Sequence, residues 1–169
     1  QLNWLDWTFQ DAKGKVELLR EYNIPVWVME PLRGGRLAKL REEHEAKLKA
    51  LRPEETIPAW AFRFLQSLPG VTETLSGMSD FQQLKENIET FETYKPLTEA
   101  EMETLLGIAG EMLQGNVLPC TACRYCTSHC PQELDIPYLL ELYNEHSFTG
   151  AGAFIAPMAL GALPAERQP

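Results

Sequence analysis

The sequence predicts a parallel α/β fold followed by a small, cysteine-rich helical module. Over residues 1–97, short apolar runs alternate with amphipathic helical patterns, as in chains that build a parallel sheet. All four cysteines then fall in one run, Cys120-Thr-Ala-Cys123-Arg-Tyr-Cys126-Thr-Ser-His-Cys130-Pro131. With 169 residues, 44% of them hydrophobic, the chain can form one ordinary domain, or a small domain with an appendage.

Charge and hydropathy exclude two classes of partner. The 15 Lys and Arg residues face 24 Asp and Glu residues, and the net charge of −9 argues against binding to a nucleic-acid backbone. No apolar run reaches about 18 residues, and the N-terminus lacks the basic and apolar regions of a signal peptide. We therefore expect a soluble cytoplasmic protein with no membrane or nucleic-acid partner.

The N-terminal third predicts a strand, a helix and a second strand. Gln1–Leu5 alternates as a short strand, and residues 11–22 carry apolar side chains at helical spacing. After a break at Pro25, the apolar run Val26–Met29 is typical of a strand buried on both faces. This order indicates a parallel unit.

A glycine-containing loop, Glu30–Arg36, leads into a helix predicted over residues 37–51. Its leucines share one face, and the charged outer face is most simply a solvated surface. His44 lies on the leucine face, and because an isolated histidine is more often packed than ligating, we assign it no role. The predicted apolar positions are Leu37, Leu40, Leu48 and Leu51.

The middle of the chain predicts a core helix, a strand and a capped helix. Pro58–Leu68 begins with a proline that a helix tolerates and is dense in aromatics, which mainly bury area. A β-branched strand, Val71–Ser76, precedes a helix that Asp80 caps, with Gln83 at the capping-box position. The core side chains are Trp60, Phe62, Phe64 and Leu65, and the stripe of the capped helix is Phe81, Leu84, Ile88 and Phe91.

Helices also flank the cysteine run. Thr98-Glu-Ala-Glu101 is a capping box, and the helix it opens carries an apolar stripe up to a predicted end at Gly115-Asn116. A second helix is predicted over Ile136–Glu145, and the Gly-, Ala- and Pro-rich tail, residues 147–169, predicts an irregular segment. The stripes are Met102, Leu105, Leu106, Ala109, Met112 and Leu113, then Ile136, Leu139, Leu140 and Tyr143.

The spacing CxxCxxCxxxCP predicts a four-iron, four-sulfide cluster held by Cys120, Cys123, Cys126 and Cys130. Structural zinc is an alternative, although zinc sites usually separate two CxxC pairs by a longer loop. Disulfides are less in keeping with a cytoplasmic chain.

Two loops that follow predicted strands could bind an anion. Ser76-Gly-Met-Ser-Asp80 leads into a helix N-terminus, where free N–H groups and the helix dipole favour negative charge. Pro31–Gly35 has a similar position after the preceding strand. Judged from these residues alone, a plain strand-to-helix turn with an aspartate cap explains the first loop better, because helix N-termini commonly have this form.

These segments resemble the last strands of an aldo-keto reductase, through Pro31-Leu-Arg-Gly-Gly-Arg-Leu37 and Leu75-Ser-Gly-Met-Ser-Asp-Phe-Gln-Gln-Leu-Lys-Glu-Asn87. The resemblance implies the C-terminal portion of a (β/α)8 TIM barrel over residues 1–97, with Gln1–Leu5, Val26–Met29 and Val71–Ser76 as strands six to eight. Residues 98–169 would be a helical linker, a ferredoxin-type module and a tail, as in iron–sulfur members of that family.

The resemblance also implies a nicotinamide nucleotide site. Gln1 would bind the nicotinamide carboxamide; Pro31, Leu32 and Gly35 would follow the pyrophosphate; Gly77, Ser79, Gln83 and Asn87 would hold the adenosine end. Met29 and Glu30 depart from the aromatic residue and serine of many relatives. No Lys or Arg lies between Gly77 and Leu84, so the choice between NADP and NAD stays open.

The chain resembles an excised piece, since it has no initiator Met and the family's catalytic Asp, Tyr, Lys and His would lie on earlier strands. We assign no catalytic residue and expect the piece to be inactive, although its parent would move hydride between the nucleotide and a small carbonyl or alcohol. Three strands cannot close a barrel, so the open sheet edge could pair with another copy. Relatives carry a second cysteine motif; without it, Cys130 would lack its own cluster.

Two other functions remain open. The chain could be a ferredoxin-like electron-transfer or partner-docking module, acting with a redox protein and without hydride chemistry. It could also be a structural zinc protein.

Overall fold

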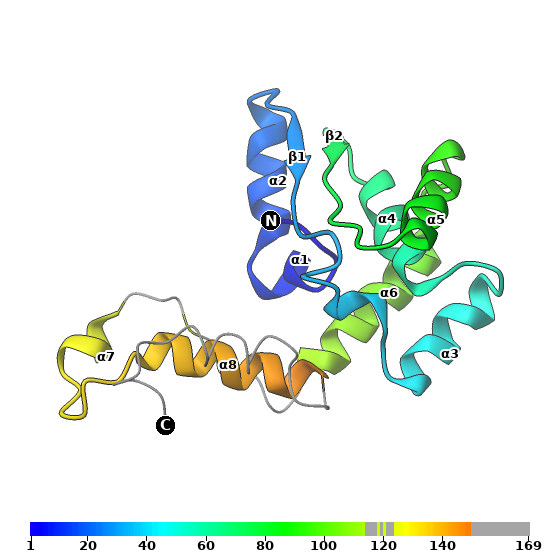
Figure 1. Ribbon diagram of the computed structural model, residues 1–169. Coiled ribbons are helices and arrows are strands. Elements are labelled where there is room, and N and C mark those ends of the chain that lie inside the picture. The colour runs from blue at the N-terminus through cyan, green and yellow to red at the C-terminus, as the bar shows by residue number, and fades with distance from the viewer. Residues whose placement is uncertain (114–117, 119, 121–123, 150–169) are drawn as a thin grey trace. The chain divides into compact units, whose positions relative to one another are not determined.

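The computed structural model describes residues 1–113, 118, 120 and 124–149 (Figure 1). The chain forms two compact units, Gln1–Glu111 and Met112–Pro169. This division differs from the predicted one after residue 97, because most of helix α6 belongs to the first unit. The described residues form a mainly helical α/β structure with eight α-helices, a 3-10 helix (η1) and a two-stranded parallel sheet. In order these are α1 (Asp6–Phe9), α2 (Ala12–Glu21), β1 (Val26–Val28), η1 (Arg36–Ala38), α3 (Glu42–Leu51), α4 (Ile57–Gln66), β2 (Val71–Thr74), α5 (Phe81–Glu92), α6 (Glu99–Leu113), α7 (Tyr125–Ser128) and α8 (Ile136–Thr149).

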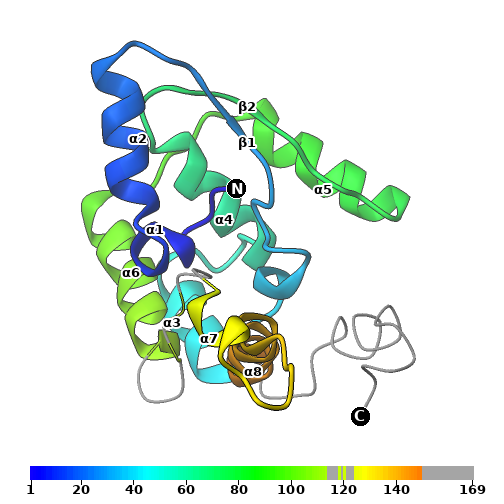
Figure 2. The same cartoon turned by 90° about the vertical axis from the view of Figure 1, so that its left-hand side faces the viewer.

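The two strands confirm the predicted parallel pairing. β1 and β2 run side by side in the first unit (Figure 2), with Val26 opposite Val71 and Val28 opposite Thr74. An irregularity in register follows Val26. The Leu75 N–H donates to the Val28 carbonyl at 2.9 Å, so the backbone pairing continues to the ends of the two strands. Among the described residues the sheet has no third strand and forms no barrel.

The predicted strand Gln1–Leu5 is wrong. A single backbone hydrogen bond, from the Leu2 N–H to the Met29 carbonyl at 3.0 Å, joins this segment to the end of β1. The chain then turns, because the Asn3 side-chain oxygen accepts from the Asp6 N–H at 2.9 Å and the Asn3 carbonyl accepts from the Trp7 N–H. Asparagine favours such local bonds over a ladder, and helix α1 begins here.

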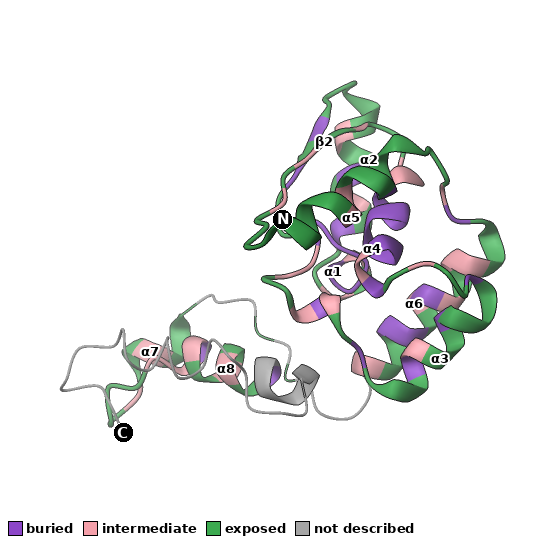
Figure 3. Ribbon diagram, turned by 45° about the vertical axis from the view of Figure 1, so that its right-hand side comes forward, coloured by how far each residue is buried: buried purple, intermediate pink, exposed green. Residues whose placement is uncertain are grey.

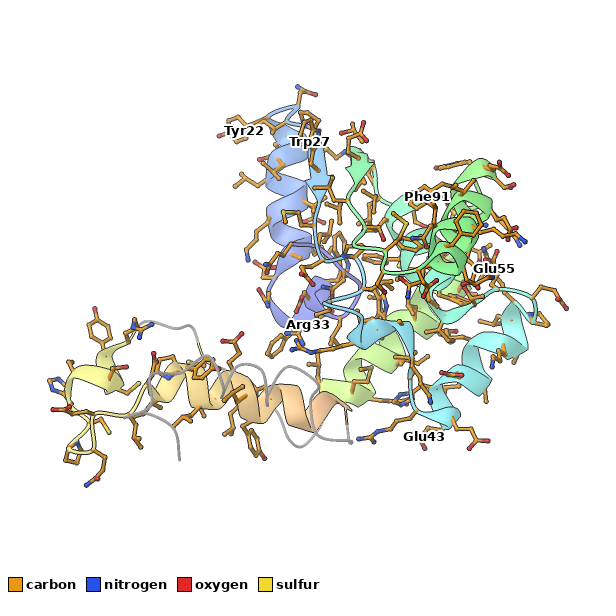
Figure 4. All side chains as sticks on the ribbon, viewed as in Figure 1. Tyr22, Trp27, Arg33, Glu43, Glu55 and Phe91 are labelled. Carbon is orange, nitrogen blue, oxygen red and sulfur yellow. The ribbon has the colours of Figure 1, made fainter. Side chains whose placement is uncertain are left out.

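β1 is not buried on both faces as predicted. Val26 and Val28 are buried, whereas Trp27 is 70% exposed and Met29 is 55% exposed. The strand is therefore covered on one face only. Figure 4 shows Trp27 and Tyr22 together near one end of β1 and α2.

Helix α4 supplies the centre of the core, as predicted. Trp60, Phe62, Phe64 and Leu65 are all almost fully buried (Figure 3). The helix begins after Thr56, whose hydroxyl accepts from the Ala59 N–H, and it has proline in its first turn. It packs against α5 and η1. Because η1 follows the loop after β1 and α5 follows the loop after β2, packing on α4 positions both loops.

Two predicted helical faces differ from those observed. The helix predicted over residues 37–51 is broken: η1 ends at Ala38 and α3 begins at Glu42, since Lys39 is extended. Leu37, Leu40 and Leu48 are buried, but Leu51 is exposed. The apolar stripe of α5 is also exposed, and its members range from Leu84 at 37% to Phe81 at 79%.

In the second unit, α8 confirms a helix from Ile136, but its predicted face is not the buried one. Leu139 and Tyr143 are exposed, whereas Pro137 and Asn144 are buried. The helix continues to Thr149, so the predicted irregular tail does not begin at residue 147. Gly115-Asn116 and residues 150–169 lie outside the described residues. No described helix is long and apolar enough to span a bilayer.

Candidate functional site

A cavity of about 740 Å³ in the first unit lies where β1 and β2 end. Its walls come from the loop after β1, the loop after β2 and the first turns of α5, with Pro58 of α4 also contributing. Ligands of parallel α/β folds bind beyond the carboxyl ends of the strands. The sheet and the core helix α4 therefore bring together two loops that are distant in the sequence.

The first loop has an unusual backbone. Four of its residues have positive φ angles. These are Glu30 at 58°, Arg33 at 50°, Gly34 at 64° and Gly35 at 86°. Positive φ is uncommon outside glycine and often marks a functional segment. A side chain at Gly35 would meet no neighbouring atom, so its glycine is required by backbone conformation and not by space.

A polar cluster under this loop holds it in place. Asp6 is buried, and its Oδ2 accepts from Asn3 Nδ2 at 2.8 Å and from Arg33 Nε at 3.3 Å. The Asn3 amide also donates to the Glu30 carbonyl at 3.2 Å. Figure 4 shows Arg33 close to α1, on which Asp6 lies. The N-terminal segment thus fixes the loop after β1, instead of adding a strand to the sheet.

The second loop enters α5 through a local hydrogen-bond network. The Asp80 carboxylate accepts from the Gln83 N–H at 2.9 Å, which confirms the predicted cap. Gln83 reaches back as predicted, but its Oε1 accepts from the N–H of Ser79, at 2.9 Å, and not from the cap residue. Asn87 Nδ2 donates to Ser76 Oγ at 3.2 Å.

All the predicted nucleotide-binding residues except Gln1 line this cavity. Gln1 is exposed and does not contribute to the walls. The residues brought together are Pro31, Leu32, Gly35, Gly77, Ser79, Gln83 and Asn87.

Sequence reasoning missed Glu86, which also lines the cavity. Its signal was available, because Gln83, Glu86 and Asn87 are three and four residues apart and so share one face of a helix. Asn3, Asp6 and Arg33 were missed as the support of the loop, since their pairing spans 27 residues.

The cavity has an acidic lining. Glu30 and Glu86 are among its lining residues, and Lys and Arg are absent from its described walls. The Glu86 Oε1 accepts from Gln82 Nε2 at 2.8 Å. A phosphate bound here would depend on backbone N–H groups and helix α5, not on cationic side chains.

The side chains whose pKa is shifted most clearly lie away from the cavity. Hydrogen bonds from Arg52 lower the pKa of Glu101 to about 2, and this pair in turn raises the pKa of Arg52. The Lys47 ammonium, at 2.6 Å, lowers the pKa of Glu111. These groups tie α6 to α3 and its C-terminal turn, so their role is structural.

The cysteine run offers thiols, which are the ligands that iron–sulfur clusters take. Cys120 and Cys126 are exposed and Cys130 is half-buried, whereas Cys123 lies outside the described residues. Within the described residues, no three His, Cys, Asp or Glu side chains gather as a metal site. The thiols are of the right chemical type for an iron–sulfur cluster, but they would have to come together to bind one.

Side-chain hydrogen bonds of the second unit are made just before this run and within it. Asn144 of α8 is buried and pairs with both backbone groups of Leu118, accepting at 2.8 Å and donating at 2.9 Å. Arg124, which lies within the run, donates to Asp135 at 2.6 Å, so this pair brackets Cys126 and Cys130. Helix α7 lies between Arg124 and Asp135 in the sequence. The turn after α7 is closed by a hydrogen bond that the Cys130 N–H donates to the Thr127 carbonyl.

Compared with protein-family models, curated proteins and solved structures, the chain shows no match.

Proposed function

We propose that this chain is the C-terminal part of an oxidoreductase of aldo-keto reductase type. Its first unit would bind NAD or NADP, and its cysteine run would hold a four-iron, four-sulfide cluster. On this proposal residues 1–97 are the end of a (β/α)8 barrel. Its parent transfers hydride to or from a small carbonyl or alcohol, and we expect the chain alone to be inactive, because the resemblance gives none of its residues a catalytic role.

One observation carries the nucleotide proposal. Residues picked from two separate sequence segments, Pro31–Gly35 and Gly77–Asn87, line a single cavity at the ends of two parallel strands. A volume of about 740 Å³ is in the range of small-molecule sites. Here the loop glycines would let backbone approach the pyrophosphate closely, while Asn87, held by Ser76, would face the adenosine.

The cluster would be held chiefly by Cys120, Cys123 and Cys126, with Cys130 as the weakest of the four ligands, because the fourth cysteine of such a run normally serves a second cluster. When bound, such a cluster accepts and donates single electrons. The chain's own residues would set its surroundings: Asn144 bonds to Leu118 just before the run, and the pair of Arg124 and Asp135 brackets Cys126 and Cys130. Exposure of Cys120 and Cys126 would leave the cluster near solvent and near a redox partner.

Exposed apolar side chains support the idea that further elements cover the first unit. Trp27 on β1, Met29 directly after it, and Phe81 and Ile88 on α5 are each at least 49% exposed. Apolar surfaces of this kind usually mark contacts with other protein segments. In a closed barrel, neighbouring strands and helices would bury them; in the isolated chain they would favour self-association at the open edge.

Nucleotide binding is tested by titrating the purified 169-residue chain with NADH and NADPH, monitoring energy transfer from tryptophan to the reduced nicotinamide. Asn87→Ala should weaken binding about tenfold, because it removes an amide that faces the nucleotide. Ile88→Ala is the matched control, since Ile88 is exposed on the same helix and lies outside the cavity lining. Absence of binding of both nucleotides would refute the nucleotide site.

Electron transfer without hydride chemistry is the second candidate, favoured by the exposed cysteine run. Anaerobic reconstitution with iron and sulfide separates the possibilities for the metal. We expect brown protein with equal iron and sulfide and a paramagnetic signal on reduction. Protein that takes up zinc and retains no sulfide would support the structural zinc alternative instead.

A further inference from the structure

The loop after β1 carries backbone N–H groups that are available to a ligand. Leu32, Gly34 and Gly35 line the cavity, and among the described residues no acceptor takes a hydrogen bond from the backbone N–H of these three. Successive N–H groups in a turn can form a concave site for an anion. On the proposed function this loop follows the pyrophosphate, so the conformation of its backbone sets how many N–H groups the pyrophosphate meets.

Arg33 is oriented differently from its neighbours in this loop. Of residues 30–35, all of which the structure describes, it is the one that does not line the cavity. Its Nε donates to the Oδ2 of Asp6 at 3.3 Å, and its guanidinium carbon lies 6.0 Å from the centre of the Phe9 ring. The Arg33 side chain is only 13% exposed, so it anchors the loop to the helix α1 beneath it.

Asn3 and Asp6 hold the two loop residues whose backbone conformation is least favourable. Glu30 and Arg33 are the non-glycine residues of this loop with positive φ. The Asn3 amide donates to the Glu30 carbonyl at 3.2 Å, and the Asp6 carboxylate accepts from Arg33. Asp6 is itself held in place, because Asn3 donates to the same oxygen at 2.8 Å. Without these bonds, both residues would favour the commoner regions of backbone conformation.

We infer that Asp6 is a positioning residue of the nucleotide site: through Arg33, it holds the loop after β1 in the form that presents backbone N–H groups to the pyrophosphate. This inference rests on the proposed function. Asp6 itself is not among the described residues that line the cavity, so it acts through the loop. A site that is formed in only a fraction of the molecules binds its ligand with an affinity reduced by that fraction. The ion pair therefore contributes to affinity by preorganisation.

The variant Asp6→Asn separates positioning from charge. Loss of a negative charge near an anion site would by itself tighten the binding of an anion, whereas loss of positioning weakens it. We expect Asp6→Asn to bind NADH about tenfold more weakly in titration calorimetry with the full chain. Adenosine, which would meet the second loop and α5 but has no phosphate, should bind the original chain and the variant within about twofold of each other.

Glu17→Gln is the matched control. It removes the same charge from an exposed position on the neighbouring helix α2, outside the cavity lining, and should leave the affinity for both ligands unchanged. A variant that is partly unfolded would lose affinity for NADH and adenosine alike, so the ratio of the two affinities reports on the loop and not on overall stability.

Limited proteolysis provides a second measurement that needs no ligand. Trypsin cuts after Arg33 only when this side chain leaves Asp6 and the loop opens. Mass spectrometry should show this cut several-fold faster in Asp6→Asn than in the original chain, relative to the cut after Lys85 on α5 as an internal reference. Overall unfolding would speed both cuts together.

Three results would contradict the inference and leave the nucleotide site intact. These are NADH binding that is unchanged or tighter in Asp6→Asn, an equal loss of affinity for NADH and adenosine, and an unchanged rate of cleavage after Arg33. Failure of the original chain to bind NADH would refute the site, and the inference with it.

Discussion

The ion pair between Arg52 and Glu101 joins the turn after α3 to the first turn of α6. Two oxygens of Glu101 accept from the Arg52 guanidinium, at 2.5 and 2.7 Å. Arg52 also donates to the carbonyls of Lys95 and Pro96, which precede α6. Both side chains are largely buried, at 8% and 13% exposure. We therefore expect Glu101→Gln to destabilise the first unit.

The magnitude follows from the pKa of Glu101, which lies at about 2 instead of the ordinary 4.5. That difference corresponds to about 3 kcal/mol in favour of the ionised carboxylate in the folded protein. Residual solvent access reduces it, so we expect Glu101→Gln to lower the free energy of unfolding by about 2 kcal/mol at neutral pH. The glutamine can still accept the Thr98 N–H as a capping box, so the change isolates the ion pair.

The effect should depend on pH in a defined direction. Folding lowers the pKa of Glu101, so its contribution is complete above the unfolded pKa and is lost as the pH falls from 4.5 toward 2. The gap between the original chain and Glu101→Gln should therefore be about 2 kcal/mol at pH 6 and close to zero near pH 2.

Urea unfolding, followed by circular dichroism at several pH values, measures this gap without adding salt. Glu103→Gln is the matched control: Glu103 is exposed on the same helix, and its loss should cost less than about 0.5 kcal/mol. A gap that stays constant from pH 6 to pH 2, or an equal loss in both variants, would refute the reasoning.

Three further predictions concern the core, a helix cap and the cysteine run. Phe62→Ala should lower the free energy of unfolding by about 3–5 kcal/mol in urea titrations, since Phe62 is fully buried and its truncation leaves a cavity in the core. Asp80→Ala should cost about 1 kcal/mol and Asp80→Ser much less, because serine still caps α5; equal losses would contradict the cap. After anaerobic reconstitution, Cys126→Ser should lose more iron than Cys130→Ser, because the fourth cysteine of such a run normally serves a second cluster.

Local signals in the sequence predicted much of the secondary structure. The cap at Asp80 and the box of Thr98 and Glu101 both form, and Glu101 Oε2 accepts from the Thr98 N–H at 2.7 Å. These signals succeed because the partners lie three residues apart, so the helix itself brings them together. The dense aromatics of α4 likewise predicted the core, since such side chains seldom pack elsewhere.

Burial was harder to predict, because it depends on which elements cover a face. Val26–Met29 has the composition of a doubly covered strand, yet Trp27 is exposed. The stripe of α5 has ideal helical spacing, and it too is exposed. At Gln1–Leu5, alternation suggested a strand, but the side chain of Asn3 gave the backbone a competing local partner.

The sequence by itself determined the chemistry available to this protein: a cysteine run with cluster spacing, two glycine-containing loops after strands, and an excess of acidic charge. The tertiary structure alone decided which of these groups meet. It placed both loops around one cavity, added Glu86 to its wall, and set Asp6 beneath Arg33. The physical reason is that long-range juxtaposition follows from the parallel pairing of β1 with β2 and from packing on α4, and no pattern within a few residues encodes it.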